Sequence, residues 1–211
     1  MALTNSVGGT VKSAGTAAVI ILAAILFFSP PARAADPEAY VRSIADKLEP
    51  LLNNGHLTAE NVDTFLKANI LNQLDMQRIG RYVLRKHWKE IDQAGQEKFM
   101  DIFQYFILES FKKQLVKYSK AEIKIIRSVE HEPAGVSVIT RVRLPSKSPV
   151  NMNWRLFRDE GQIRIFDVSV QGISKLSATR AEYKSVLEKQ GFDHLITEIC
   201  NRLEGTKPAS C

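Results

Sequence analysis

The amino-acid sequence predicts an α+β domain in which a long helix, with further N- and C-terminal helices, packs against a four-stranded antiparallel meander. Residues 96–118 carry apolar side chains at spacings of three and four, which indicates one long helix with a wide apolar stripe. Residues 122–170 then change to a period of two, with turn signals between short segments. A helix laid on a sheet is the simplest arrangement that buries both apolar surfaces.

The first 34 residues have the features of a secretory signal peptide. Lys12 precedes an apolar run over residues 14–28, and a proline pair leads to the small-residue cleavage site Ala32-Arg33-Ala34. The alternative is a signal anchor, but the run is shorter than the roughly 20 residues that a spanning helix needs. We therefore expect cleavage after Ala34 and export of the mature chain.

Cleavage leaves a single domain over residues 35–204 and a flexible tail over residues 205–211. It removes Lys12 and Arg33 and no acidic residue, so the formal net charge falls from +6 to +4. A mildly basic exported chain is expected to meet anionic lipid surfaces or acidic partners, and export excludes nucleic acid in practice. Because no second apolar segment approaches the length of a membrane span, the mature chain is expected to be soluble.

Three short amphipathic helices are predicted before the long helix. The first begins at Asp36-Pro37-Glu38, where proline and acidic residues favour a helix start, and it ends near Asn54. Thr58 and Asp75 are the predicted N-caps of the second and third helices. The third helix is expected to end at Trp88 or Lys89.

The third predicted helix carries a row of basic residues at spacings of three, four and four. They are Arg78, Arg81, Arg85 and Lys89. A row of this kind is commonly a solvated helix face. The functional alternative is a docking surface for an acidic partner or for lipid headgroups.

The four predicted strands cover residues 122–129, 136–144, 150–158 and 162–170. Short connections between them favour an antiparallel meander. On the second and third strands apolar side chains alternate with polar ones, so one face of the sheet is broad and dry. The last strand alternates less cleanly, which is consistent with cover on both of its faces.

Two helices are predicted after the sheet, over residues 177–190 and 192–203, with Gly191 between them. Cys200 lies among the apolar positions of the second one, and Cys211 is the last residue. Export permits a disulfide between them, and the alternative is one buried and one exposed thiol.

Motifs of catalysis are not found in the sequence. The histidines His56, His87, His131 and His194 are scattered over different elements, and no HExxH, CxxC, GxSxG or phosphate-loop pattern occurs. Asp167 is the best candidate for an acid in a cavity, but a hydrogen-bonded aspartate at a strand edge is the simpler explanation of this residue. The sequence therefore predicts a non-enzymatic protein without cofactor or metal.

The apolar surface of the long helix and of the sheet is larger than packing between these two elements requires. It forms either a solid core or the wall of a ligand cavity, and exported proteins with wide apolar interiors are often carriers. Periodicity points to the following candidate ligand contacts. They are Phe99, Phe103, Phe106 and Ile107 on the helix and Val138, Val142, Met152, Trp154 and Leu156 on the sheet.

Three stretches resemble the MlaC family, also called the toluene-tolerance auxiliary family. Residues 75–90, DMQRIGRYVLRKHWKE, with the helix start at Gln96-Glu97-Lys98-Phe99, are similar to the pattern LGRYWRxAxxEQRxxF. Residues 165–174, IFDVSVQGIS, resemble the strand end YDVxVEGVS. Arg180 and residues 191–196, GFDHLI, then match an Arg-bearing helix and a GxDxLI helix, so the resemblance covers most of the mature chain.

The resemblance implies a periplasmic carrier whose cavity binds phospholipid acyl chains. It also implies exchange of lipid with an inner-membrane ABC transporter complex and an outer-membrane lipoprotein complex. Transient contact with the membrane surface is expected as well. Ile79, Phe166 and Gln171 stand where the family usually has Leu, Tyr and Glu. Two alternatives stay open, a carrier of hopanoids or other polar lipids and a non-catalytic adaptor with a solid core.

Overall fold

The computed structural model describes residues 36–211 except residues 54–57, 116–117, 132, 134, 146, 160 and 206. The predicted signal peptide, residues 1–34, lies outside the described residues. Within the described part of the chain, no helix is both long enough and apolar enough to cross a membrane.

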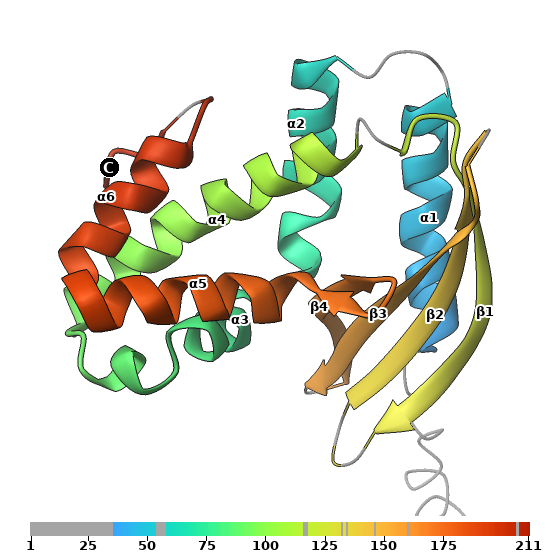
Figure 1. Cartoon of the computed structure of the whole chain (residues 1–211). Helices are drawn as coiled ribbons and strands as arrows, with labels where there is room; N and C mark the ends of the chain where they lie inside the picture. The colour runs from blue at the N-terminus through green and yellow to red at the C-terminus, as the bar shows by residue number, and fades with distance from the viewer. Residues whose placement is uncertain are drawn as a thin grey trace, which may run out of the picture. The chain divides into compact units, whose positions relative to one another are not determined.

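Helices precede the sheet and follow it, as the pattern predicts (Figure 1). The first helices are α1 (Pro37–Asn53), α2 (Ala59–Asn69), α3 (Met76–Leu84) and α4 (Gln93–Leu115), with short 3₁₀ turns at Leu71–Gln73 (η1) and Arg85–Lys89 (η2). The last two are α5 (Lys175–Gln190) and α6 (Phe192–Arg202). Thr58 and Asp75 cap α2 and α3 by accepting hydrogen bonds from the backbone N–H groups of Asn61 and Arg78.

The sheet is an antiparallel meander in the order β1-β2-β3-β4-β5. Its strands are β1 (Glu122–His131), β2 (Gly135–Arg143), β3 (Val150–Asp159), β4 (Gln162–Val170) and β5 (Ile173–Ser174). The predicted α+β class and meander are confirmed, but the sheet has a fifth strand. The sequence pattern missed β5 because two residues are too short to show a period.

The irregular alternation of β4 has a local cause. Leu156 of β3 pairs with Ile165, and the preceding Arg155 pairs with Asp167, so Phe166 is an extra residue in β4. Such a bulge changes which side chains share a face. Ile165 and Phe166 are both buried. The ring of Phe166 lies beside Phe157 on the opposite face from Trp154 and Leu156. Tyr82 of α3 packs against Phe166 there, with the ring centroids 5.2 Å apart, so β4 is covered on both faces.

The third helix is shorter than predicted. α3 ends at Leu84, and the chain continues as the 3₁₀ turn η2 from Arg85, whose φ of 50° is a left-handed conformation. The predicted end at Trp88 or Lys89 is therefore wrong. α3 packs closely on α4 at Gly80, because a Cβ there would clash with the Met100 sulfur.

The C-terminal segment is attached to the helical part of the domain. Cys200 and Cys211 form a disulfide, with their Cα atoms 5.7 Å apart. The Ser210 hydroxyl donates a hydrogen bond to Asp101 of α4, and Pro208 is buried. These contacts differ from the flexible tail expected over residues 205–211, and they settle the open question of the two cysteines in favour of a bridge.

Candidate functional site

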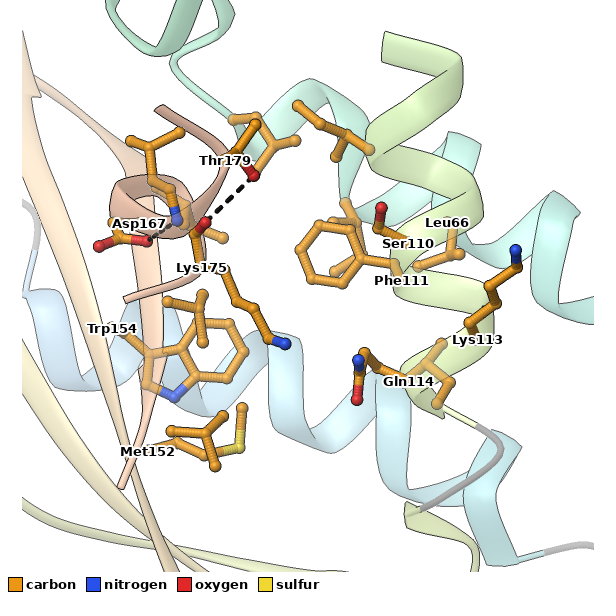
Figure 2. A pocket seen from close by; sticks show the side chains of 18 of the residues that line it. Leu66, Ser110, Phe111, Lys113, Gln114, Met152, Trp154, Asp167, Lys175 and Thr179 are labelled. Carbon is orange, nitrogen blue, oxygen red and sulfur yellow. Dashed lines mark hydrogen bonds between the residues drawn. The ribbon is translucent and has the colours of Figure 1, made fainter. Parts of the chain in front are cut away.

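A pocket of about 470 Å³ lies within the domain, between helices and the dry face of the sheet (Figure 2). Its walls come from the helices α1 to α4, the strands β1 to β4 and the first half of α5. Most of the lining is aliphatic or aromatic, including Leu48, Leu52 and Leu66 on the first two helices. Pockets of this size and character are typical of sites for apolar small molecules.

Six of the nine residues predicted as ligand contacts line this pocket. They are Phe103, Phe106, Ile107, Val142, Met152 and Trp154. Their positions follow from two periodicities, because i, i+3 and i+4 residues share a helix face and alternate residues share a sheet face. The long helix and the sheet thus form facing walls, as their patterns suggest.

The other three predicted contacts, Phe99, Val138 and Leu156, lie outside the pocket lining and are 0% exposed. Phe99 sits one turn before Phe103 and stacks on it, with the ring centroids 5.0 Å apart. Val138 and Leu156 lie further along the dry face from Val142 and Met152. Periodicity identifies a buried face, but it does not show where along that face the packing opens.

Tyr183 of α5 packs against the aromatic rings that α4 presents to the pocket, Phe103 and Phe106. The Tyr183 ring lies 5.9 Å from Phe103 and 6.0 Å from Phe106, measured between centroids. Burial raises the pKa of the Tyr183 hydroxyl well above its ordinary value. The described residues offer this hydroxyl no hydrogen-bond partner. Because the Tyr183 ring packs against Phe103 and Phe106, α5 fixes the orientation of the rings that face the pocket.

Trp154 is held in place by a buried polar contact. Its indole Nε1–H donates a hydrogen bond of 3.1 Å to the hydroxyl of Thr140, which is 0% exposed. Trp154 pairs with Val138 and Thr140 with Met152 across β2 and β3. The bond satisfies the one polar atom of the indole and presents the apolar ring to the pocket.

Asp167, the candidate acid, has a structural role. Its carboxylate accepts hydrogen bonds from the Ser174 hydroxyl (2.6 Å) and from the Leu176 backbone N–H (3.2 Å). Both donors lie at the start of α5, so Asp167 joins β4 to this helix. No cluster of three or more metal-ligating side chains occurs among the described residues, and His56 lies outside them.

Helices α2 and α4, which form one side of the pocket, are connected by ion pairs. The Lys112 ammonium lies 2.7 Å from Asp63 and 2.8 Å from Glu109, and Lys67 lies 2.7 Å from Asp63. Burial alone would raise the pKa of Asp63, but the hydrogen bonds from Lys112 and Lys67 outweigh it and lower the pKa below its ordinary value.

The four predicted docking residues are all exposed, but they do not form one helical row. Because α3 ends at Leu84, Arg85 and Lys89 belong to η2. Arg78 pairs with Asp75 (2.7 Å) and covers the Phe157 ring at 4.4 Å, whereas Arg81 has no ion pair with any described residue. Exposure agrees with either interpretation of these residues, a solvated surface or a docking surface.

Periodicity did not predict that α1, α2, α3, β1 and α5 contribute to the pocket. Leu48 and Leu66 belong to amphipathic stripes that periodicity reveals, but the pattern does not say what each stripe faces. Lys175 and Thr179, at the start of α5, also line the pocket. The sequence carries no signal for these two, because their position depends on β5 and on the bond between Asp167 and α5.

The family model of the MlaC protein matches residues 42–201 of the chain, which include every residue that lines the pocket. The chain belongs to the MlaC family. The resemblance of the three sequence stretches is thereby confirmed.

Two individual proteins extend the comparison. The intermembrane phospholipid transport system binding protein MlaC of Haemophilus influenzae is 23% identical over 192 residues, covering 87% of this chain and 90% of that protein. A phospholipid-binding protein from Ralstonia solanacearum, solved in complex with a phospholipid, superposes with a TM-score of 0.68 at 18% identity. That match covers 80% of this chain and 97% of the other, and it supports the fold of this MlaC-family chain.

Proposed function

We propose that this MlaC-family chain is a carrier that binds the acyl chains of a phospholipid in the pocket between α4 and the sheet. The observation that carries the proposal is the apolar pocket of about 470 Å³, lined by Phe106, Ile107 and Trp154. The similarity to a phospholipid transport binding protein supports phospholipid as the cargo. The chemistry required is binding alone, which agrees with the structural role of Asp167.

The need for such a pocket follows from the cost of exposing acyl chains. Each methylene group in water costs about 0.8 kcal/mol, so two chains of about 15 carbons represent roughly 20 kcal/mol or more. A lipid that crosses an aqueous compartment alone meets this whole barrier. A protein that covers the chains with Phe, Leu and Trp side chains removes most of it and leaves the headgroup near the pocket mouth.

We place this carrier in the periplasm, where the predicted signal peptide would deliver it. Its partners there are an inner-membrane ABC transporter complex and an outer-membrane lipoprotein complex, which the intermembrane transport system of the relative supports. The exposed residues Arg78, Arg81, Arg85 and Lys89 are our candidate docking surface for these partners or for the membrane surface. The mixed placement of these residues on α3 and η2 suits a broad patch rather than a narrow stripe.

Lipid uptake from vesicles tests the proposal. The mature chain is incubated with phospholipid vesicles and separated from them, and the bound lipid is extracted and measured by mass spectrometry. Phe106→Gln places an amide in the pocket wall and is expected to weaken uptake roughly tenfold. The matched control is Ile126→Gln, on β1 outside the pocket lining, where the side chain is 46% exposed.

The proposal expects the native chain and the control to take up equal amounts of lipid. Circular dichroism and thermal unfolding of Phe106→Gln show whether the fold is retained. Absence of lipid from the native chain, or equal uptake by Phe106→Gln and the native chain, would contradict the proposal. The mass spectrum also identifies the lipid, so a hopanoid or another polar lipid would appear directly.

A further inference from the structure

The pocket lining contains four charged side chains among the described residues, and three of them are engaged. Asp167 accepts hydrogen bonds from Ser174 and Leu176, and Glu182 pairs with Arg202. Lys113 lies 2.7 Å from Glu204. The fourth charged side chain, Lys175, is different, because its ammonium group has no ion-pair partner within the described part of the chain.

Figure 2 shows the Lys175 side chain extending away from Asp167 into the pocket, toward Gln114 of α4. Gln114 is half-buried and also lines the pocket, and its amide makes no hydrogen bond with any described residue. A cation and an unpaired amide thus face the same space from α5 and α4. Both can donate hydrogen bonds to an anionic oxygen at the border of an otherwise apolar site.

Lys175 is placed against the preference of its own helix. It is the first residue of α5, and the positive end of the helix dipole disfavours a cation in this position. The nearby backbone N–H groups of Leu176 and Ser177 are already bonded to Asp167 and Ser174. Lys175 therefore adds nothing to helix capping, and its charge is available to a ligand.

We infer that Lys175, assisted by Gln114, binds the phosphate end of the bound lipid and favours headgroups with a net negative charge. This inference rests on the proposed function and names the lipid class within it. A phosphatidylglycerol headgroup offers its phosphate to Lys175 without a competing cation. A phosphatidylethanolamine headgroup brings its own ammonium group, which Lys175 repels at short range.

Competition between these two lipids tests the inference. The chain is incubated with vesicles of phosphatidylglycerol and phosphatidylethanolamine in equal amounts, and mass spectrometry measures the ratio of the two lipids bound. The native chain is expected to favour phosphatidylglycerol by roughly two- to fivefold, the range typical of a partly exposed charge pair. Added salt lowers this ratio, because the interaction is screened.

The Lys175→Gln variant removes the charge, and the ratio is expected to fall to about one without loss of thermal stability. Lys175→Arg retains the preference. Gln114→Glu keeps the size of the side chain and compensates Lys175, so it also brings the ratio to about one. Lys189→Gln is the matched control, because Lys189 is exposed on the same helix and lies outside the pocket lining. It keeps the native ratio, which separates the pocket from general attraction to anionic vesicles.

An equal ratio in the native chain, or an unchanged ratio in Lys175→Gln, overturns the inference while lipid uptake still supports the carrier function. A native chain that takes up neither lipid overturns the carrier function as well. A drop in the ratio with Lys189→Gln equal to that with Lys175→Gln also overturns the inference, because the preference then comes from net charge.

Discussion

The contact between Thr140 and Trp154 shows how one buried hydroxyl fixes the position of an aromatic ring in the pocket wall. Thr140 lies on a strand face that otherwise carries Val136, Val138 and Val142, and its hydroxyl accepts the indole N–H. An unpaired buried donor costs more than its hydrogen bond contributes. The polar residue within this apolar strand face therefore stabilises both the ring orientation and the fold.

The variant Thr140→Val keeps the size of the side chain and removes the acceptor. We expect the free energy of unfolding to fall by about 1–3 kcal/mol, because the Trp154 N–H is left buried and unpaired. Urea unfolding measures the change. The control Thr197→Val removes an exposed hydroxyl on α6 that bonds its own helix, and its expected change is within about 0.5 kcal/mol. Equal changes in the two variants would show that the hydrogen bond to Trp154 contributes no more to the free energy of unfolding than an exposed hydrogen bond within a helix.

Single residues also show where sequence reasoning stops. The sequence identified Asp167 as either a cavity acid or a bonded aspartate at a strand edge. Only the fold decides between them, because Ser174 and Leu176 reach the carboxylate after the turn at Gln171 and Gly172. Both turn residues have positive φ, which returns the chain toward β4. The same turn positions Lys175 at the pocket.

At the scale of elements, the link between α2 and α4 predicts a dependence of stability on pH. The lowered pKa of Asp63 means that the folded chain holds its carboxylate charged more strongly than the unfolded chain does. The resulting stabilisation is fully present above the ordinary pKa of 3.8 and is lost as the pH falls through the lower folded-state pKa.

Asp63→Asn is therefore expected to lower the free energy of unfolding by about 1 kcal/mol at neutral pH. This difference from the native chain should shrink as the pH falls below 3.8 and through the lower folded-state pKa, because protonation then removes the charge in both states. Urea unfolding at neutral and at acidic pH measures it. Asp46→Asn is the control, since Asp46 is exposed on α1 and has no ion pair with a described residue. A difference that stays constant with pH would exclude the carboxylate charge as its cause.

The disulfide closes the C-terminal segment onto the helices. The bridge spans 11 residues, and the segment also reaches α4 through Glu204 and Ser210. Cys211→Ser is expected to lower the free energy of unfolding by about 2–3 kcal/mol, mainly because the unfolded chain gains freedom. Reductant should lower the stability of the native chain equally and leave the variant unchanged. Equal unfolding midpoints with and without reductant would contradict this prediction.

Elements with a clear period were the most predictable. The long helix and strands β1 to β4 lie within a few residues of their expected bounds. The end of α3 was missed, because residues 85–89 keep a helical spacing of apolar and basic side chains while Arg85 adopts a left-handed φ. The bulge at Phe166 explains why the period of β4 was ambiguous.

At the scale of the whole molecule, the pocket depends on relations that periodicity does not contain. The sequence predicted two facing walls, and residues such as Phe106 and Trp154 are where it placed them. It could not predict that α1, α2 and the start of α5 complete the enclosure, because each helix pattern fits several partners. Whether the walls meet or leave a space depends on the packing of all these elements together.

The central claim is that acyl chains lie in this pocket against Trp154. The chain has two tryptophans, and Trp88 on η2 lies outside the pocket lining. In a Trp88→Phe variant, fluorescence therefore reports on Trp154 alone. The decisive measurement is the fluorescence of this variant after uptake of phospholipid with brominated acyl chains, compared with the same lipid without bromine. Strong quenching by the brominated chains is the predicted result, and lipid uptake without quenching would contradict the claim.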